Sequence, residues 1–155
     1  FEDMQTVIKN PETYLLINTL PLNEQQCLIR GTVSCEQEET AINKYIRENK
    51  GLKIIIYGKN CNDDSIHKKY QQLISLGFYN VYAYNGGMFE WLMLQDIYGE
   101  SEFPTTNKQL DILNFKPNKN KGIQTPKLNL QSASIILLSR SSHNVHADQN
   151  VRAWF

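Results

Sequence analysis

The sequence lacks several features that would assign a chain to a functional class at once. Its charged side chains balance, with 16 Asp and Glu residues against 16 Lys and Arg residues. A neutral chain has no general electrostatic attraction to polyanions or to anionic lipids. No apolar run approaches the roughly 20 residues that a membrane-spanning helix needs. We therefore expect neither nucleic acid nor a membrane as a partner.

Cysteine is also scarce, and its placement excludes two kinds of small stabilised domain. The three cysteines are Cys27, Cys35 and Cys61. An odd number at irregular spacing does not suit a disulfide framework, and no Cys-x-x-Cys pair suggests structural zinc. We predict an intracellular protein with reduced thiols, in which Cys27 and Cys35 lie in or near the core.

One pattern offers a metal-binding alternative near the end of the chain. His143, His146 and Asp148 form a His-x-x-His-x-Asp sequence, and imidazole and carboxylate groups are common metal ligands. These residues lie in a serine-rich segment, so we interpret them as surface side chains. The prediction is that the protein needs no metal and no other cofactor.

Strand signals alternate with helix signals through the first hundred residues. Apolar runs at residues 14–18, 53–57 and 80–84 predict strands, and the second is continuous and rich in isoleucine. Such a run is typical of a central parallel strand buried on both faces. A further short apolar stretch lies at residues 27–33. Alternation of this kind predicts a parallel sheet with right-handed helical crossovers.

The intervening segments have helical periodicity and recognisable ends. Residues 34–49 predict a helix that begins after Ser34 and is followed by Gly51 as a left-handed cap. Residues 65–76 predict a second helix. Residues 89–98 are apolar nearly all round, which predicts a largely buried helix that includes Ile97. Gly86 and Gly87 precede it, in a tight turn that needs positive φ or a close backbone approach.

The remainder of the chain changes composition. A short helix is predicted near residues 108–113, with Thr106 as its cap. From residue 116 to residue 130 the chain is rich in Lys, Asn and Pro without periodicity, which indicates an extended arm. We therefore divide the chain into a domain at residues 1–115 and a C-terminal arm at residues 116–155.

Several of these segments together resemble the rhodanese-like domain family. The chain has Ile55-Ile56-Tyr57, then a helix ending Leu73-Ile74-Ser75-Leu76-Gly77-Phe78. It continues with Asn80-Val81-Tyr82 and with Gly86-Gly87-Met88-Phe89-Glu90-Trp91. Leu16-Ile17-Asn18 and Leu28-Ile29-Arg30-Gly31-Thr32 resemble earlier parts of the family pattern more loosely. The resemblance covers about residues 10 to 100 and implies a three-layer α/β fold with a central parallel sheet flanked by helices.

The resemblance also implies a chemistry and a place for it. The family transfers sulfur through a persulfide on the cysteine that directly follows the central strand, and loop amides with an arginine hold the anionic substrate. Related folds with a longer loop are phosphatases. The corresponding loop here follows Tyr57, at the carboxyl end of the sheet, where open α/β folds bind ligands. The residues that would form an anion cradle are Gly58, Lys59, Asn60, Asn62, Asp63, Asp64 and Ser65.

This loop departs from the family pattern in its reactive groups. Gly58 occupies the position of the nucleophile, Cys61 follows three residues later, and the loop and next helix contain no arginine. Lys59 and the helix dipole favour a thiolate, whereas Asp63 and Asp64 oppose both a thiolate and a bound anion. The aspartates would oppose them less if they faced outward as helix caps.

Two functions remain open from the sequence. The first is a non-catalytic rhodanese-like domain that serves as a protein-binding or assembly module through its C-terminal arm. The apolar run at residues 135–138 and the terminal Trp154-Phe155 would contact the partner, unless this segment folds back on its own domain. The second is a sulfurtransferase, or less readily a phosphatase, that uses Cys61 as its nucleophile.

Overall fold

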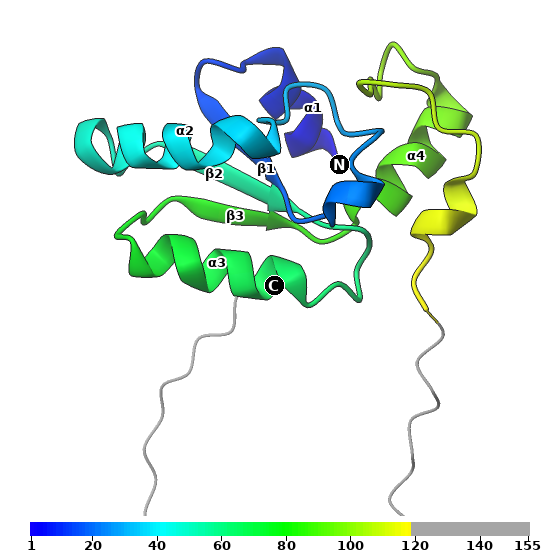
Figure 1. Ribbon diagram of the computed structural model, residues 1–155. Helices are drawn as coiled ribbons and strands as arrows, with labels where there is room; N and C mark the ends of the chain where they lie inside the picture. The colour runs from blue at the N-terminus through cyan, green and yellow to red at the C-terminus, as the bar shows by residue number, and fades with distance from the viewer. Residues whose placement is uncertain (119–155) are drawn as a thin grey trace, which may run out of the picture. The chain divides into compact units, whose positions relative to one another are not determined.

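Three parallel strands form the centre of the computed structural model, which describes residues 1–118 (Figure 1). They are β1 (Tyr14–Asn18), β2 (Lys53–Tyr57) and β3 (Val81–Tyr84), in the sheet order β1-β2-β3. In the pairing register, Ile55 of the central strand lies between Leu16 and Tyr82. The three predicted strands are confirmed, the last beginning one residue later than expected.

Helices connect and cover the strands. The α-helices are α1 (Glu2–Lys9), α2 (Cys35–Glu48), α3 (Ser65–Ser75) and α4 (Gly87–Tyr98), and two short 3₁₀-helices are η1 (Leu22–Glu24) and η2 (Ile112–Phe115). The chain therefore passes from strand to helix to parallel strand twice, as the alternating sequence pattern predicts.

The two faces of the sheet carry separate hydrophobic clusters. One cluster packs Ile42 of α2 and Leu73 of α3 against Ile54 and Ile56. The other packs residues of α1 and α4 against alternate strand residues such as Ile55. Since successive strand residues point to opposite faces, this division makes a three-layer domain. The predicted fold class, a central parallel sheet flanked by helices, is confirmed.

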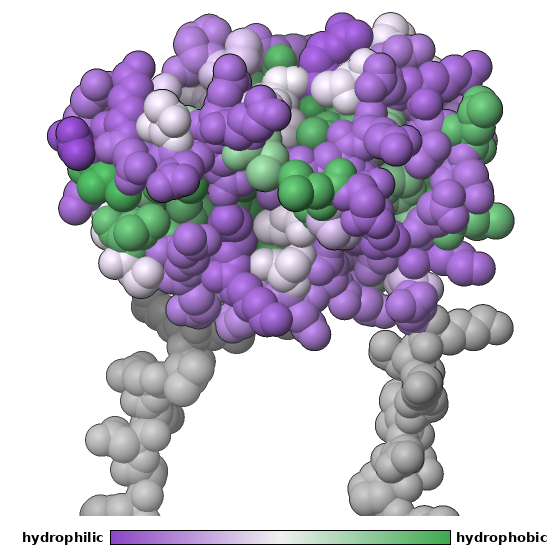
Figure 2. Space-filling view, viewed as in Figure 1, coloured by the Kyte–Doolittle hydropathy of each residue, from purple (hydrophilic) through white to green (hydrophobic). Residues whose placement is uncertain are grey.

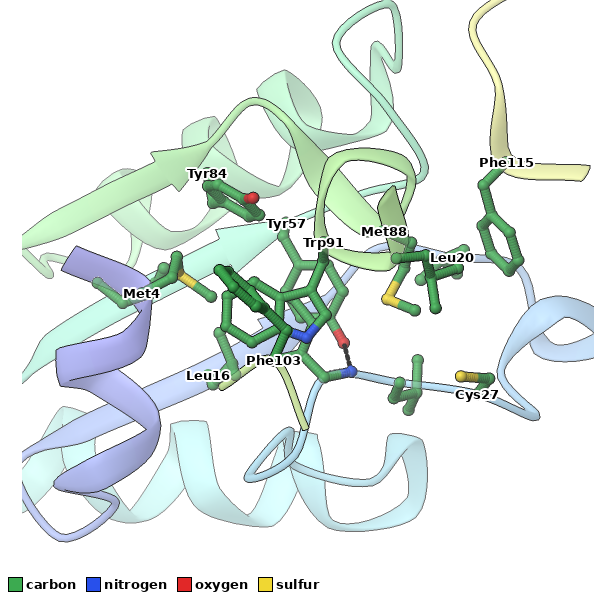
Figure 3. Close-up of a cluster of buried hydrophobic side chains, with 14 of the residues drawn as sticks. Met4, Leu16, Leu20, Cys27, Tyr57, Tyr84, Met88, Trp91, Phe103 and Phe115 are labelled. Carbon is green, nitrogen blue, oxygen red and sulfur yellow. Dashed lines mark hydrogen bonds between the residues drawn. The ribbon is translucent and has the colours of Figure 1, made fainter. Parts of the chain in front are cut away.

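The cluster on the α1 and α4 side is built around aromatic rings (Figure 3). Trp91 is fully buried and meets Phe103 edge to face, with ring centroids 4.9 Å apart. Tyr57, also fully buried, accepts a hydrogen bond from the Ile29 N–H at 3.2 Å, and its hydroxyl lies 2.8 Å from Thr32 Oγ1. Burial raises the pKa of Tyr57 well above its ordinary value, so the hydroxyl stays protonated. This residue ties the end of β2 to the segment around Ile29.

We expect Tyr57→Phe to destabilise the domain by about 1–3 kcal/mol, because the buried Ile29 N–H loses its acceptor. Urea denaturation measures the change in the free energy of unfolding. Tyr82→Phe is the matched control, since Tyr82 is 50% exposed and its change should stay within about 0.5 kcal/mol. Equal losses in the two variants would contradict this role for the Tyr57 hydroxyl.

Two predictions about the helices are wrong. The outer face of α4 is not buried: Met93, Ile97 and Tyr98 are 44%, 66% and 61% exposed. The apolar composition of a helix does not determine whether other segments of the chain pack against its outer face. Gly51 is not a left-handed cap, since it is not among the glycines with positive φ. Its lack of a side chain instead leaves room for the Tyr79 hydroxyl.

Other local predictions need correction as well. The segment predicted as a helix near residues 108–113 forms only η2, whose first turn is capped by Asp111 Oδ1, 3.1 Å from the Leu113 N–H, rather than by Thr106. Cys27 is buried as expected, but Cys35 is exposed because it opens α2 at the surface. The apolar stretch at residues 27–33 contributes single β-bridges, at Ile29 and Thr32.

The face of the molecule shown in Figure 2 is largely polar. Figure 2 shows one face on which hydrophobic residues occur in small, separate groups among hydrophilic ones. Within residues 1–118, every helix is too short or too polar to cross a bilayer. The predictions for residues 119–155, including the apolar run, the terminal aromatic pair and the histidine pattern, lie outside the described residues.

Candidate functional site

The candidate site is the loop from Gly58 to Asp64, which joins the end of β2 to the start of α3. It lies at the carboxyl end of the central strand, the edge at which parallel sheets bind ligands. The buried strand fixes the first residue of the loop, and the first turn of α3 fixes the last. The side chains and amides of the residues between these two ends determine whether the loop can bind an anion or hold a nucleophile.

Gly58 is buried and leaves no space for a side chain. A Cβ atom built on it would overlap Asp63 Oδ2 and would lie 2.9 Å from both Asp63 Cγ and Thr19 Oγ1. These separations are below any normal van der Waals contact. The carboxylate of Asp63 therefore occupies the space into which a side chain at position 58 would project.

Asp63 is held there by hydrogen bonds from the loop itself. Its Oδ2 accepts from the Lys59 N–H at 2.8 Å, and its Oδ1 accepts from the Ser65 N–H at 2.9 Å and from the Ser65 hydroxyl. Partial burial alone would raise the pKa of Asp63, but these hydrogen bonds and the Lys59 charge outweigh it and lower the pKa. The side chain is thus a carboxylate bound by backbone amides, as an external anion would be.

Two further loop amides are also directed at internal oxygen atoms. The Asn62 N–H donates to Asn60 Oδ1 at 3.0 Å, and the Asp63 N–H donates to the Asn60 carbonyl at 3.1 Å. Together with the amides on Asp63, four backbone donors of the predicted anion cradle already have acceptors within the loop. An anion that used them would have to displace these contacts.

Asn60 is the buried anchor of the loop. It is only 7% exposed, and its Nδ2 donates to the Phe115 carbonyl at 2.8 Å, which connects the loop to η2. The sequence did not reveal this role, because an asparagine in a polar loop has no distinguishing pattern. Its hydrogen-bond partner, the Phe115 carbonyl, is distant along the chain and becomes a neighbour only in the folded structure.

Lys59, the basic residue of the loop, is engaged outside it. Its Nζ lies 2.8 Å from Glu24 Oε1 on η1, and 5.8 Å from the centroid of the Phe115 ring. The ammonium group therefore neutralises a carboxylate on a neighbouring element. Glu24 did not stand out in the sequence, since its only signal is a negative charge far from the loop along the chain.

Cys61 lies on the exposed outer part of the loop. Its Sγ is 3.7 Å from Asn62 Oδ1, a contact in which the thiol is the donor. The neighbouring Asp64 is exposed, and its side chain makes no capping hydrogen bond to α3. Of the two aspartates considered as helix caps, Asp63 is the one that accepts an amide from the first residue of α3.

A pair of hydroxyl groups completes the inner side of the site. The Ser65 and Thr19 hydroxyl oxygens lie 2.7 Å apart, and the Thr19 N–H donates to the Tyr57 carbonyl at 2.9 Å. Thr19 follows β1, so these contacts join the carboxyl ends of β1 and β2. Within the described residues, these contacts bring no nucleophilic group into the site other than the Ser65 and Thr19 hydroxyls.

The start of α4 fixes the loop from the other side. The Met88 N–H donates to the Gly58 carbonyl and the Phe89 N–H donates to the Lys59 carbonyl, each at 3.0 Å. Gly87 has φ of +60°, and a Cβ atom on it would lie 2.5 Å from the Gly58 carbonyl oxygen. The sequence predicted positive φ or a close backbone approach at this turn, and Gly87 shows both.

Metal binding finds no geometric support within residues 1–118, where no three His, Cys, Asp or Glu side chains come together. The three cysteines are free thiols. The polar side chains of the loop form hydrogen bonds with the backbone of the same loop.

The lowered pKa of Asp63 predicts a pH dependence of stability. A carboxylate whose pKa falls on folding contributes stability above its unfolded pKa, and this contribution is lost as pH drops through the lower folded value. We expect Asp63→Asn to flatten the decline in unfolding free energy between neutral pH and about pH 3. Asp64→Asn, which removes the same charge from an exposed neighbour, should leave the decline unchanged. An equal effect of the two substitutions would contradict the role of Asp63.

Comparisons with known proteins agree with the fold. The family model of the rhodanese-like domain matches residues 8–94, which is more than half of the chain. The chain belongs to the rhodanese-like domain family. No curated protein sequence matches the chain significantly.

A solved structure with a TM-score above 0.5 has the same fold at low sequence identity. The Alr3790 protein from Anabaena sp. is 17% identical, with a TM-score of 0.51, over 73% of this chain and 95% of that one. The BH2092 protein from Bacillus halodurans is 21% identical, with a TM-score of 0.49, over 59% and 68% of the two chains. The rhodanese-like domain from the Anabaena protein, solved by NMR, is 16% identical with a TM-score of 0.48, over 99% and 94%.

Proposed function

We propose that this protein is a non-catalytic rhodanese-like domain that serves as a protein-binding or assembly module. The observation that carries the proposal is the Asp63 carboxylate, which fills the space beside Gly58 and accepts two loop amides. The family pattern places the nucleophile at position 58 and an anionic substrate on those amides. Here an internal anion takes the place of both.

Electrostatics supports the same conclusion. A second anion about 5 Å from Asp63 would be opposed by roughly 3 kcal/mol at an effective dielectric near 20. Solvent screening reduces this value at the open side of the loop. Lys59 offsets little of it, because its charge is paired with Glu24. Thiosulfate and phosphate would therefore bind weakly unless Asp63 moved.

The decisive experiment is an assay of thiocyanate release from thiosulfate and cyanide, run on the full chain. We expect turnover no faster than the uncatalysed reaction, and no change with Cys61→Ser. Cys35→Ser is the matched control, because Cys35 is also exposed but lies on α2. Robust turnover that Cys61→Ser abolishes and Cys35→Ser preserves would overturn the proposal.

A second candidate function follows from the exposure of Cys61 in this loop. In that case the Cys61 thiolate attacks the sulfane sulfur of thiosulfate, the sulfur–sulfur bond breaks, and sulfite leaves. The resulting persulfide would then pass its outer sulfur to cyanide and regenerate the thiolate. Mass spectrometry after thiosulfate treatment detects the persulfide as one added sulfur on the peptide that contains Cys61. Its absence would remove this candidate.

The binding half of the proposal concerns the C-terminal arm at residues 116–155. Its apolar run at residues 135–138 is suited to contact a partner protein. The test is affinity capture with the full chain and with a full-length variant carrying Ile136→Ser and Leu137→Ser. We expect the substitutions to release a partner that Cys61→Ser retains. Identical capture by all three proteins would place binding elsewhere.

A further inference from the structure

The outer face of α4 carries an exposed apolar stripe. Met93 and Ile97 are 44% and 66% exposed, and they lie one helical turn apart. Phe89, which is partly buried, extends the stripe by one turn toward the start of the helix. Because the Phe89 amide donates to the Lys59 carbonyl at 3.0 Å, the stripe begins beside the candidate loop and runs away from it.

Two carboxylates flank this stripe. At about 100° of rotation for each residue, Glu90 and Asp96 fall on opposite sides of the line through Met93 and Ile97. Neither carboxylate forms an ion pair within residues 1–118. The sequence from residue 70 to residue 107, which contains α4, has four acidic residues and no lysine or arginine. The face is therefore apolar along its centre and negative along both edges.

These charges distinguish between possible occupants of the face. A second copy of the same face would bring carboxylates against carboxylates, which opposes self-association. Residues 1–118 as a whole are also negative, with 15 Asp and Glu residues against 11 Lys and Arg residues. A segment with apolar side chains along its centre and basic side chains on both flanks would complement the stripe and its edges.

We propose that the outer face of α4 binds a basic amphipathic helix of a partner protein. A helix has no unpaired backbone edge, so the partner is held by side chains. Met93 and Ile97 would pack into the grooves between apolar side chains of that helix, and its Lys or Arg residues would pair with Glu90 and Asp96. With 12 residues, α4 is about 18 Å long and contacts about three turns of the partner.

This inference rests on the proposed function, because it assigns a docking surface to the protein-binding module. It uses neither Gly58 nor Cys61, so the two ideas can fail separately. Thiosulfate turnover that depends on Cys61 would overturn the proposed function and leave binding at α4 unchanged. A helical peptide that does not bind α4 would overturn the inference and leave the thiosulfate result unchanged.

The test is an NMR titration of the full chain with a peptide of leucine, lysine and alanine. The peptide has about 18 residues, which is long enough to form a helix, and its leucines lie in one stripe. We expect saturable shifts at the amides of Met93, Asp96 and Ile97, with a dissociation constant below about 100 μM. A shuffled peptide whose leucines surround the helix, and a peptide with glutamate in place of lysine, should each bind about tenfold more weakly or less.

Substitutions on α4 assign the apolar part of the binding. Ile97→Gln should weaken binding by about tenfold, because the peptide would bury the exposed part of the Ile97 side chain. Ile74→Gln is the matched control, since Ile74 is 38% exposed on α3, which packs against the other face of the sheet. Binding to this control should be unchanged. Melting curves verify that both variants are folded.

A charge reversal assigns the electrostatic part. Asp96→Lys should weaken binding by about threefold or more. Glu39→Lys, which makes the same change at an exposed position of α2, should have no effect.

Three results of the titrations would overturn the proposal. They are no saturable shifts up to about 1 mM peptide, equal binding of the shuffled peptide, and equal losses in Ile97→Gln and Ile74→Gln. Without peptide, α4 amide shifts that depend on protein concentration would show that a second copy occupies the face. Shifts at α4 caused by Ile136→Ser with Leu137→Ser would show that the chain's own arm does so. Either of these occupants would also overturn the proposal.

Discussion

Substituting Gly87 by alanine should destabilise the domain by about 3 kcal/mol or more. Two costs combine at this position. The backbone has φ of +60°, which costs a residue with a Cβ atom about 1–2 kcal/mol. The new methyl group would also lie 2.5 Å from the Gly58 carbonyl oxygen and 2.9 Å from the Asn60 nitrogen. Because both contacts are backbone atoms, α4 and the loop would have to separate.

Urea denaturation of Gly87→Ala and Gly31→Ala distinguishes the two costs. Gly31 has φ of +88°, but a Cβ atom built on it meets no other atom within 4 Å. Its substitution should therefore carry only the conformational cost of about 1–2 kcal/mol. If the two variants lose the same stability, the close approach between the turn and the loop is not important.

The second large effect is expected for Gly58→Cys, which restores the residue type of the family pattern. The new Cβ atom would overlap Asp63 Oδ2, so the carboxylate would have to leave the Lys59 and Ser65 amides. Losing those hydrogen bonds and crowding the buried position should cost about 2–4 kcal/mol in unfolding free energy. We expect this variant to show no thiosulfate activity, because no basic group replaces the displaced carboxylate.

A double-mutant cycle tests whether Gly58 and Asp63 depend on each other. In an Asp63→Ala background the carboxylate is absent, so Gly58→Cys should cost less than it does in the original protein. The expected interaction energy is about 1–3 kcal/mol. Asp64→Ala provides the control background, since the Asp64 side chain is exposed and makes no capping contact. Strict additivity of Gly58→Cys and Asp63→Ala would show that Asp63 does not exclude a side chain at position 58.

The fold was largely predictable because its signals are local. The continuous apolar run of β2, the helix periodicity and the glycine turn before α4 each follow from the nature of neighbouring residues. Gly87 was recognisable because two adjacent glycines before an apolar helix have few other uses. The errors arose where burial depends on distant segments, as for Ile97 on α4, which is 66% exposed.

The site was predictable in position but not in structure. The loop was located by the end of a buried strand and by the resemblance of the flanking segments to a family. The replacement of the nucleophile by Gly58 was also visible in the sequence. The acceptors of the loop amides were not predictable from the sequence. Asp63 could face outward, toward α3 or toward Gly58, and the same sequence is compatible with each of these directions.

By itself the sequence determined the layered α/β architecture, the family and the absence of a cysteine directly after β2. These properties follow from hydrophobic periodicity and residue identity, which are local. Only the tertiary structure decided that the Asp63 carboxylate fills the space beside Gly58 and that Lys59 pairs with Glu24. Both depend on side-chain directions set by hydrogen bonds from Lys59 and Ser65 and by the ion pair with Glu24 of η1. Glu24 and Lys59 lie 35 residues apart along the chain. Asp63 is close to Gly58 in the sequence, but the direction of its side chain is fixed by hydrogen bonds that only the folded loop provides.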